Sequence, residues 1–132
     1  MKHSFSEEGL CPADSYGTDD ADKAAETYKI ATYSAIDYTQ FKDCIIKKHV
    51  IIIGTALDRE NWKDGILEAG ENSTTDGHGT WLFDFDEITE INGLTEYYVG
   101  VNTWGGDWGF DGKYYMKYNY APFILWAYTV EI

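Results

Sequence analysis

Basic residues are scarce in this sequence of 132 residues. Lysine and arginine together number 10 against 23 aspartates and glutamates, so the formal net charge is −13 at pH 7. A chain with this excess of negative charge is repelled by phosphate backbones and by anionic bilayers. Nucleic acids and membrane surfaces are therefore excluded as expected partners.

Long apolar segments are also missing. A membrane-spanning helix needs about 20 consecutive apolar residues, whereas the longest aliphatic run here is Val50-Ile51-Ile52-Ile53. The first residues contain no apolar stretch of signal-peptide length. The sequence as written therefore predicts no export signal and no transmembrane segment, and it leaves the cellular location open.

Cysteine and proline are rare, with two of each. Cys11 and Cys44 are too few to build a disulfide scaffold, and whether they pair is left open. The paired Cys and His spacings of zinc sites do not occur. The acidic cluster around Gly17 lacks the spacing of a calcium loop, so we interpret it as a solvated loop. We expect neither a metal site nor a cofactor.

Aromatic residues, in contrast, are abundant. The sequence holds five Trp, eleven Tyr and six Phe, and 44% of its residues are hydrophobic. That apolar content is enough for a packed core, and the length suits one domain. We expect an acidic N-terminal segment at residues 1–25, followed by one β-rich domain at residues 26–132.

The hydrophobic pattern predicts one short helix among several strands. Asp37 or Thr39 can cap this helix, and its buried stripe holds Phe41, Cys44, Ile45 and Lys48. We interpret Cys44 as a small core residue. Alternation predicts strands at 26–37, 49–57, 78–86, 97–104, 113–120 and 123–130, with a long loop at 58–75. The expected fold is α+β and mostly β, with an antiparallel sheet that closes toward a half-barrel.

Two short segments carry residues suited to chemistry. Gly77-His78-Gly79-Thr80 opens one predicted strand, and Asn102-Thr103-Trp104-Gly105 ends another, 24 residues further along. If these strands are antiparallel neighbours, His78 and Asn102 come together as a base and the group that orients it. A Trp lying over the pair excludes water and strengthens their hydrogen bond.

The residues alone also permit other interpretations. His78 can be an ordinary loop or core histidine. Trp104, Trp108 and their glycines can form a structural turn, in which glycine takes a positive φ. An aromatic face rich in Tyr can also bind sugars.

The two segments resemble the C-terminal domain of papain-like (C1 family) cysteine peptidases. That family has a Gly-His-Ala strand start and then an Asn-Ser-Trp-Gly-x-x-Trp-Gly-x-x-Gly-Tyr stretch. Here Asn102 to Gly105, Trp108-Gly109 and Gly112 match in register, with Tyr114 one place late. Upstream, residues 26–37, 41–48, 49–57 and 62–66 resemble the family's strand, short helix, strand and Trp-containing loop.

The resemblance implies a role for each residue of the site. His78 would be the general base, Asn102 its orienter and Trp104 the shield over their hydrogen bond. Trp108 would line the leaving-group subsite, and Gly77 and Gly105 would support the cleft.

Departures from the family are as informative as the matches. The family's nucleophile lies in a Gln-x-x-x-x-x-Cys-Trp motif of a separate domain, and no such motif occurs in these 132 residues. Gly79-Thr80-Trp81 replaces the usual small and aliphatic residues after the His, which is expected to bring an indole near the cleft. Val101 stands where the family usually has Lys. Without a nucleophile, no acyl-enzyme can form on this chain alone.

Three functions are therefore possible. Whether the protein is an enzyme stays open, but we expect the isolated chain to be inactive. In the first, the domain is a pseudoenzyme, inactive alone, that serves as a structural or binding module in a larger assembly. In the second, it is the His/Asn half of a split or processed cysteine endopeptidase completed by another chain. In the third, it is an unrelated β-rich binding domain. The expected partner is another protein chain, either a Cys-bearing domain or assembly subunits, with a peptide substrate only in the completed enzyme.

Overall fold

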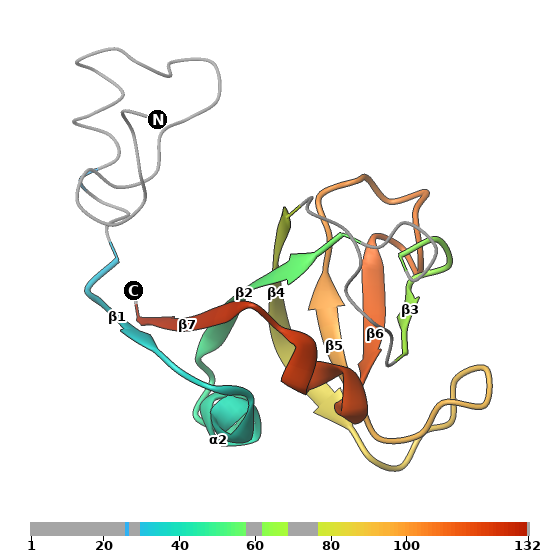
Figure 1. Ribbon diagram of the computed structural model, residues 1–132, viewed down its shortest axis with the longest axis horizontal. Helices are drawn as coiled ribbons and strands as arrows, with labels where there is room; N and C mark the ends of the chain where they lie inside the picture. Colours follow the sequence, from blue (N-terminus) through green and yellow to red (C-terminus); the bar gives the residue numbers. More distant parts are fainter. Residues whose placement is uncertain (1–25, 27–29, 58–61, 69–76, 132) are drawn as a thin grey trace. The chain divides into compact units, whose positions relative to one another are not determined.

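The computed structural model describes residues 26, 30–57, 62–68 and 77–131 (Figure 1). The predicted acidic segment at 1–25, Cys11 and most of the loop at 58–75 lie outside the described residues. The chain divides into a smaller unit of residues 1–34 and 130–132 and a larger unit of residues 35–129. The proposed division at residue 25 stays a prediction. No described helix is long and apolar enough to cross a membrane.

Short strands dominate the described structure. Their order along the chain, with one α-helix and two 3₁₀ segments, is β1 (Thr32–Ala35), η3 (Tyr38–Gln40), α2 (Phe41–Ile46), β2 (Val50–Ala56), β3 (Ile66–Leu67), β4 (Gly77–Asp86), β5 (Tyr97–Val101), β6 (Lys113–Lys117), η4 (Tyr118–Phe123) and β7 (Trp126–Glu131). This content confirms the mostly β, α+β prediction.

The seven strands form one mixed sheet in the order β1-β7-β2-β4-β5-β6-β3. The prediction that the sheet closes toward a barrel was wrong, because the sheet is open: β1 and β3 form its two edges and do not pair with each other. The prediction of a purely antiparallel sheet was also wrong, since β3 pairs with β6 in parallel. The strand β3 is only two residues long and lies inside the segment predicted as a loop, so it is too short to show alternation.

The helix begins and ends close to the predicted residues. Asp37 caps the turn η3 by accepting a hydrogen bond from Thr39 N at 2.8 Å, and α2 follows without a break. Phe41 and Ile45 are buried, as their spacing predicts. Lys48 lies beyond the helix with φ of 66°, because the chain turns there toward β2.

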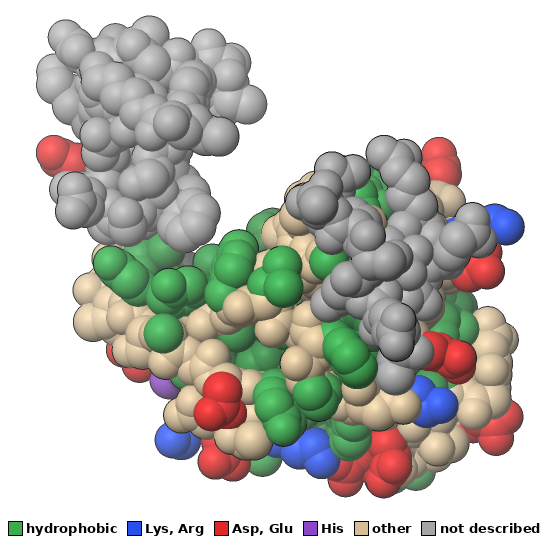
Figure 2. Space-filling model, viewed as in Figure 1, with side chains coloured by type: hydrophobic (Ala, Val, Ile, Leu, Met, Phe, Trp, Pro, Cys, Tyr) green, Lys and Arg blue, Asp and Glu red, His purple; other side chains and the backbone are tan. Residues whose placement is uncertain are grey.

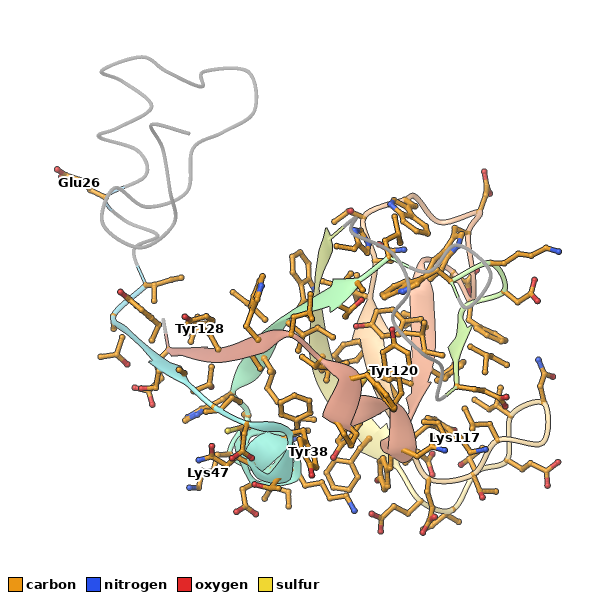
Figure 3. The ribbon with its side chains drawn as sticks, in the orientation of Figure 1. Glu26, Tyr38, Lys47, Lys117, Tyr120 and Tyr128 are labelled. Carbon is orange, nitrogen blue, oxygen red and sulfur yellow. The ribbon has the colours of Figure 1, made fainter. Side chains whose placement is uncertain are left out.

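Some strands are shorter than the sequence predicts. The first begins only at Thr32, β5 ends at Val101, and β6 ends at Lys117, where η4 begins. Tyr120 of η4 is fully buried and points among the packed side chains of the larger unit (Figure 3). An aromatic residue can therefore belong to the core without continuing the strand.

The core of the larger unit lies on one face of the central strands and under α2. Its buried members are Phe41, Ile45, Ile51, Ile53, Trp62, Leu67, Leu82, Tyr98, Tyr114, Met116, Tyr120, Ala121 and Ala127. Burial alternates along β4, where Thr80 and Leu82 are buried and the residues on either side of them are exposed. The same alternation sets the orientation of His78, two residues before Thr80.

Candidate active site

His78 and Asn102 lie together at the edge formed by the start of β4 and the end of β5. These strands are antiparallel neighbours, with Trp81 opposite Val101. Extending this register by one residue places Asn102 opposite Thr80. His78 is two residues before Thr80 and points to the same face of β4, which brings it near Asn102. The His78 Nε2 atom lies 2.8 Å from Asn102 Oδ1. His78 is partly buried, and Asn102 is 6% exposed.

The backbone at Thr103 determines which nitrogen of His78 carries the proton. Thr103 N donates a hydrogen bond to Asn102 Oδ1 at 2.8 Å. A backbone N–H can only donate, so the Asn102 atom facing it is the oxygen. The same oxygen faces His78 Nε2, which must therefore donate. Neutral His78 then has an unprotonated Nδ1, which is available to accept a proton.

Two tryptophans from the loop after β5 enclose the imidazole region. The Trp104 ring stacks on His78 with centroids 4.8 Å apart and an interplanar angle of 27°. Trp108 packs edge-on against Trp104 at 5.2 Å and donates from Nε1 to the Trp62 carbonyl at 3.0 Å. Trp104 is itself 43% exposed, so one part of its ring faces solvent while the ring stacks on His78. The geometry suits the shielding role predicted for Trp104.

Glycines allow the loop to return to the sheet. Gly105 has φ of 92°, and Asn102 N donates across the loop to Gly112 O at 2.9 Å. Gly109, with φ of 60°, passes so close to Lys113 that a Cβ atom would lie 2.5 Å from its carbonyl oxygen. Gly77 differs from these, because no heavy atom of the described residues, its chain neighbours aside, lies within 4 Å of where its Cβ would be. Packing therefore does not explain a glycine at position 77.

Sequence reasoning assigned no role to Trp62, which the structure places at the centre of this site. Its side chain is fully buried, and its ring meets His78 edge-on at 5.0 Å with an interplanar angle of 88°. It also contacts Trp104 at 5.9 Å and Trp108 at 6.0 Å. A single Trp in a polar loop gives no periodic signal, so only its aromatic character pointed to burial.

Trp81 does not lie beside the cleft, and the prediction that it would was wrong. It is three residues from His78 on β4, and side chains an odd number of residues apart point to opposite faces of a strand. Its neighbours across the sheet are Ile52 and Val101, and it is 41% exposed. Val101, where the family usually has Lys, belongs to that same outer face.

Within the described part of the chain, no thiol lies at the site. Cys44 is in α2, is a free thiol and packs against the core, as predicted for a small core residue. Thr55 pairs with His78 across β2 and β4, but it is fully buried and donates to the Ala56 carbonyl at 2.9 Å. The described residues contain no group of three His, Cys, Asp or Glu that could hold a metal ion.

This geometry defines a class of site. An arrangement in which an amide oxygen holds one imidazole nitrogen and leaves the other turned away from it suits a base that activates a nucleophile. The family comparison agrees: the papain family cysteine protease model matches residues 3–124. The chain therefore belongs to the papain family of cysteine proteases, which excludes the alternative of an unrelated β-rich domain.

Individual relatives share the fold at low sequence identity. Human cathepsin O is 27% identical over 95 residues, which cover 68% of this chain and 28% of cathepsin O. Xylellain, a cysteine protease from Xylella fastidiosa, superposes with a TM-score of 0.74 at 19% identity over 96% of this chain. The bromelain protease from Ananas comosus, solved in complex with the E64 inhibitor, gives 0.66 at 13% identity over 95% of this chain. Digestive procathepsin L 3 of Tenebrio molitor larval midgut gives 0.67 at 16% identity over 94% of this chain.

The chain is much shorter than these relatives. It spans 28% of cathepsin O, and 58%, 64% and 44% of the xylellain, bromelain and procathepsin chains.

Proposed function

We propose that this chain supplies the general base and its orienter to a cysteine peptidase centre whose thiol comes from outside these 132 residues. The thiol would belong either to another part of a longer polypeptide or to a second chain. The observation that carries this proposal is the hydrogen bond of 2.8 Å between His78 and Asn102. It leaves Nδ1 of His78 as the proton acceptor.

The proposed chemistry uses both nitrogens of His78. Nδ1 accepts the proton of the incoming thiol, and the thiolate attacks a peptide carbonyl. The resulting imidazolium returns that proton to the leaving amine, and a second cycle with water releases the acid. Asn102 Oδ1 accepts from Nε2–H throughout. Because the amide is neutral, it orients the ring in both charge states.

Enclosure by aromatic rings supports this role. The stacked Trp104 ring keeps water from competing for the Nε2–H···Oδ1 hydrogen bond. Hydrogen bonds are stronger in such a region of low dielectric. A histidine kept only for packing would not need its hydrogen bond to be shielded in this way.

A second candidate function is favoured by a different observation. In this candidate the domain is a non-catalytic structural or binding module within a larger protein assembly. The sheet face opposite His78 carries exposed apolar side chains, with Trp81 at 41%, Phe83 at 40% and Trp126 at 47% exposure. Figure 2 shows hydrophobic side chains gathered over β7 on the face in view. Apolar surface of this kind suits contact with another protein.

The test compares the chain, produced with its natural flanking sequence and partner chains, with a His78→Ala variant. The preparation is assayed for hydrolysis of a fluorogenic peptide and is then treated with iodoacetamide, after which mass spectrometry identifies the alkylated cysteine. The proposal expects alkylation outside residues 1–132 to stop hydrolysis. It also expects His78→Ala to reduce kcat/KM by about 10²–10⁴-fold, the usual contribution of a general base.

Two results separate the candidates. If no hydrolysis is found, while partner chains co-purify equally well with wild type and His78→Ala, the domain is a non-catalytic module. If hydrolysis is found but is insensitive to His78→Ala, both candidates fail. Ile88→Ala serves as the matched control, because Ile88 is 93% exposed and follows the end of β4 that is farthest from His78.

A further inference from the structure

Trp62 fills the space between the imidazole of His78 and a buried polar pair of the sheet. Its ring lies 5.0 Å from His78 and also 5.0 Å from Tyr114, with an interplanar angle of 59° to the latter. Tyr114 is on β6 and His78 on β4, so the indole bridges two strands that are not adjacent. None of the Trp62 side chain is exposed.

Two hydrogen bonds hold the backbone at Trp62 and shortly after it. Trp108 Nε1 donates to the Trp62 carbonyl at 3.0 Å. Three residues further along, Gly65 O accepts a hydrogen bond from Tyr115 N at 2.9 Å, where β3 joins β6. The backbone on which the indole is mounted is therefore fixed.

Tyr114 supports the indole from behind, and it is itself held in place. Its ring lies against Gly100 of β5, since a Cβ at position 100 would come within 2.2 Å of Tyr114 Cζ. Its hydroxyl lies 2.7 Å from Thr80 Oγ1, two residues along β4 from His78. The ring is thus tied to β6 by the backbone and to β4 by this hydrogen bond.

The size of the indole matters more than its N–H group. Trp62 Nε1 is buried and makes no hydrogen bond among the described residues. An unpaired buried donor is unfavourable, and a phenyl ring would not have one. The benefit of a Trp at this position therefore comes from the volume that it fills.

We propose that Trp62, supported by the Thr80–Tyr114 hydrogen bond, is a positioning residue that keeps the His78 ring in the one orientation that pairs Nε2 with Asn102. The second torsion of a histidine side chain is broad and roughly two-fold, so a ring flip that exchanges its edges is inexpensive unless neighbours block it. Trp104 covers one face of the ring, and Trp62 meets it at 88°. Together they prevent the flip. This inference rests on the proposed function, because it concerns the base of that same site.

The test is made on the chain alone, by long-range ¹H–¹⁵N NMR of the His78 imidazole at a pH where the ring is neutral. Wild type is expected to show one form, with the proton on Nε2. In Trp62→Phe, the form that lacks the Asn102 hydrogen bond is expected to rise about two- to tenfold, the range that one aromatic pair contributes. The control is Trp81→Phe. Trp81 is on β4 like His78 but points to the opposite face of the sheet, so this change should leave the spectrum unchanged.

A second variant covers the case in which Trp62→Phe does not fold. Thr80→Val combined with Tyr114→Phe removes the hydrogen bond behind the indole without leaving either hydroxyl unpaired, and it should raise the same minor form by a smaller factor. The proposal is overturned if the folded variants match wild type, or if Trp81→Phe has the same effect. This measurement uses no substrate and does not need the proposed thiol from outside residues 1–132. A failed hydrolysis assay would therefore overturn the proposed function without altering this result.

Discussion

The buried hydrogen bond between Thr80 and Tyr114 offers the sharpest test of how this sheet is stabilised. Thr80 is 1% exposed and Tyr114 is fully buried, and their oxygens lie 2.7 Å apart. Burial also raises the pKa of Tyr114 above its usual range, so the phenol stays protonated. Each hydroxyl thus has a neutral partner that water cannot replace.

The expected magnitudes follow from what each change leaves behind. Tyr114→Phe leaves the Thr80 hydroxyl unpaired, and Thr80→Val leaves the Tyr114 phenol unpaired. Each should lower the free energy of unfolding by about 1–3 kcal/mol, the penalty for an unsatisfied buried polar group. The double variant leaves no unpaired group, so its stability should lie within about 1 kcal/mol of wild type. The single changes are therefore expected to be strongly non-additive.

Urea unfolding of the four proteins measures this coupling, with the m-value checked for constancy. For a domain of this size, each kcal/mol corresponds to a shift of about 3–5 °C in Tm, which gives an independent measurement. Additive single effects would refute the reasoning. So would a neutral Tyr114→Phe, because the Thr80 hydroxyl would then have found a backbone acceptor, as Thr55 does with Ala56.

Three further outcomes are expected. Gly100→Ala should destabilise the domain by about 3 kcal/mol in urea unfolding, through overpacking against the core; Gly79→Ala, with no atom within 4 Å of the new methyl group, should be neutral or slightly stabilising. The Lys42 ammonium lowers the pKa of Glu87, so this carboxylate stabilises the fold at neutral pH and loses that effect as the pH falls below its ordinary value of 4.5. Glu87→Gln should therefore lower Tm at pH 7 but not at pH 2.5, and an equal loss at both pH values would contradict this. Burial raises the pKa of Tyr98 to about 12; its protonated form stabilises the fold until the pH passes the ordinary value of 10. The tyrosinate absorbance that Tyr98 contributes, measured as the difference between wild type and Tyr98→Phe, should therefore rise together with alkaline unfolding rather than before it.

Much of the local structure could be predicted from the sequence because the signals for it are local. Asp37 caps the turn that leads into α2, and Phe41 and Ile45 are buried at helical spacing. The pairing of His78 with Asn102 required only that two strands joined by a hairpin be neighbours, which is the commonest arrangement. The face to which Trp81 points could also have been predicted from the sequence, because Trp81 is an odd number of residues from His78 on the same strand.

The surroundings of His78 could not be predicted in this way. Trp62 lies in a loop, 16 residues before His78 and 52 before Tyr114, and no periodic pattern links the three positions. Likewise, nothing in the sequence pairs Thr80 with Tyr114. Their contact depends on β5 lying between β4 and β6 and on the absence of a side chain at Gly100.

The sequence by itself thus determined the alternating strands, the capped helix and the pairing of His78 with Asn102. Each of these is encoded by neighbouring positions or by a short motif. Only the tertiary structure decided that the sheet is open, that β3 joins it in parallel and that an indole from a loop packs against the imidazole of His78. Those features depend on strand order and side-chain volume, which become defined only when distant segments pack against one another.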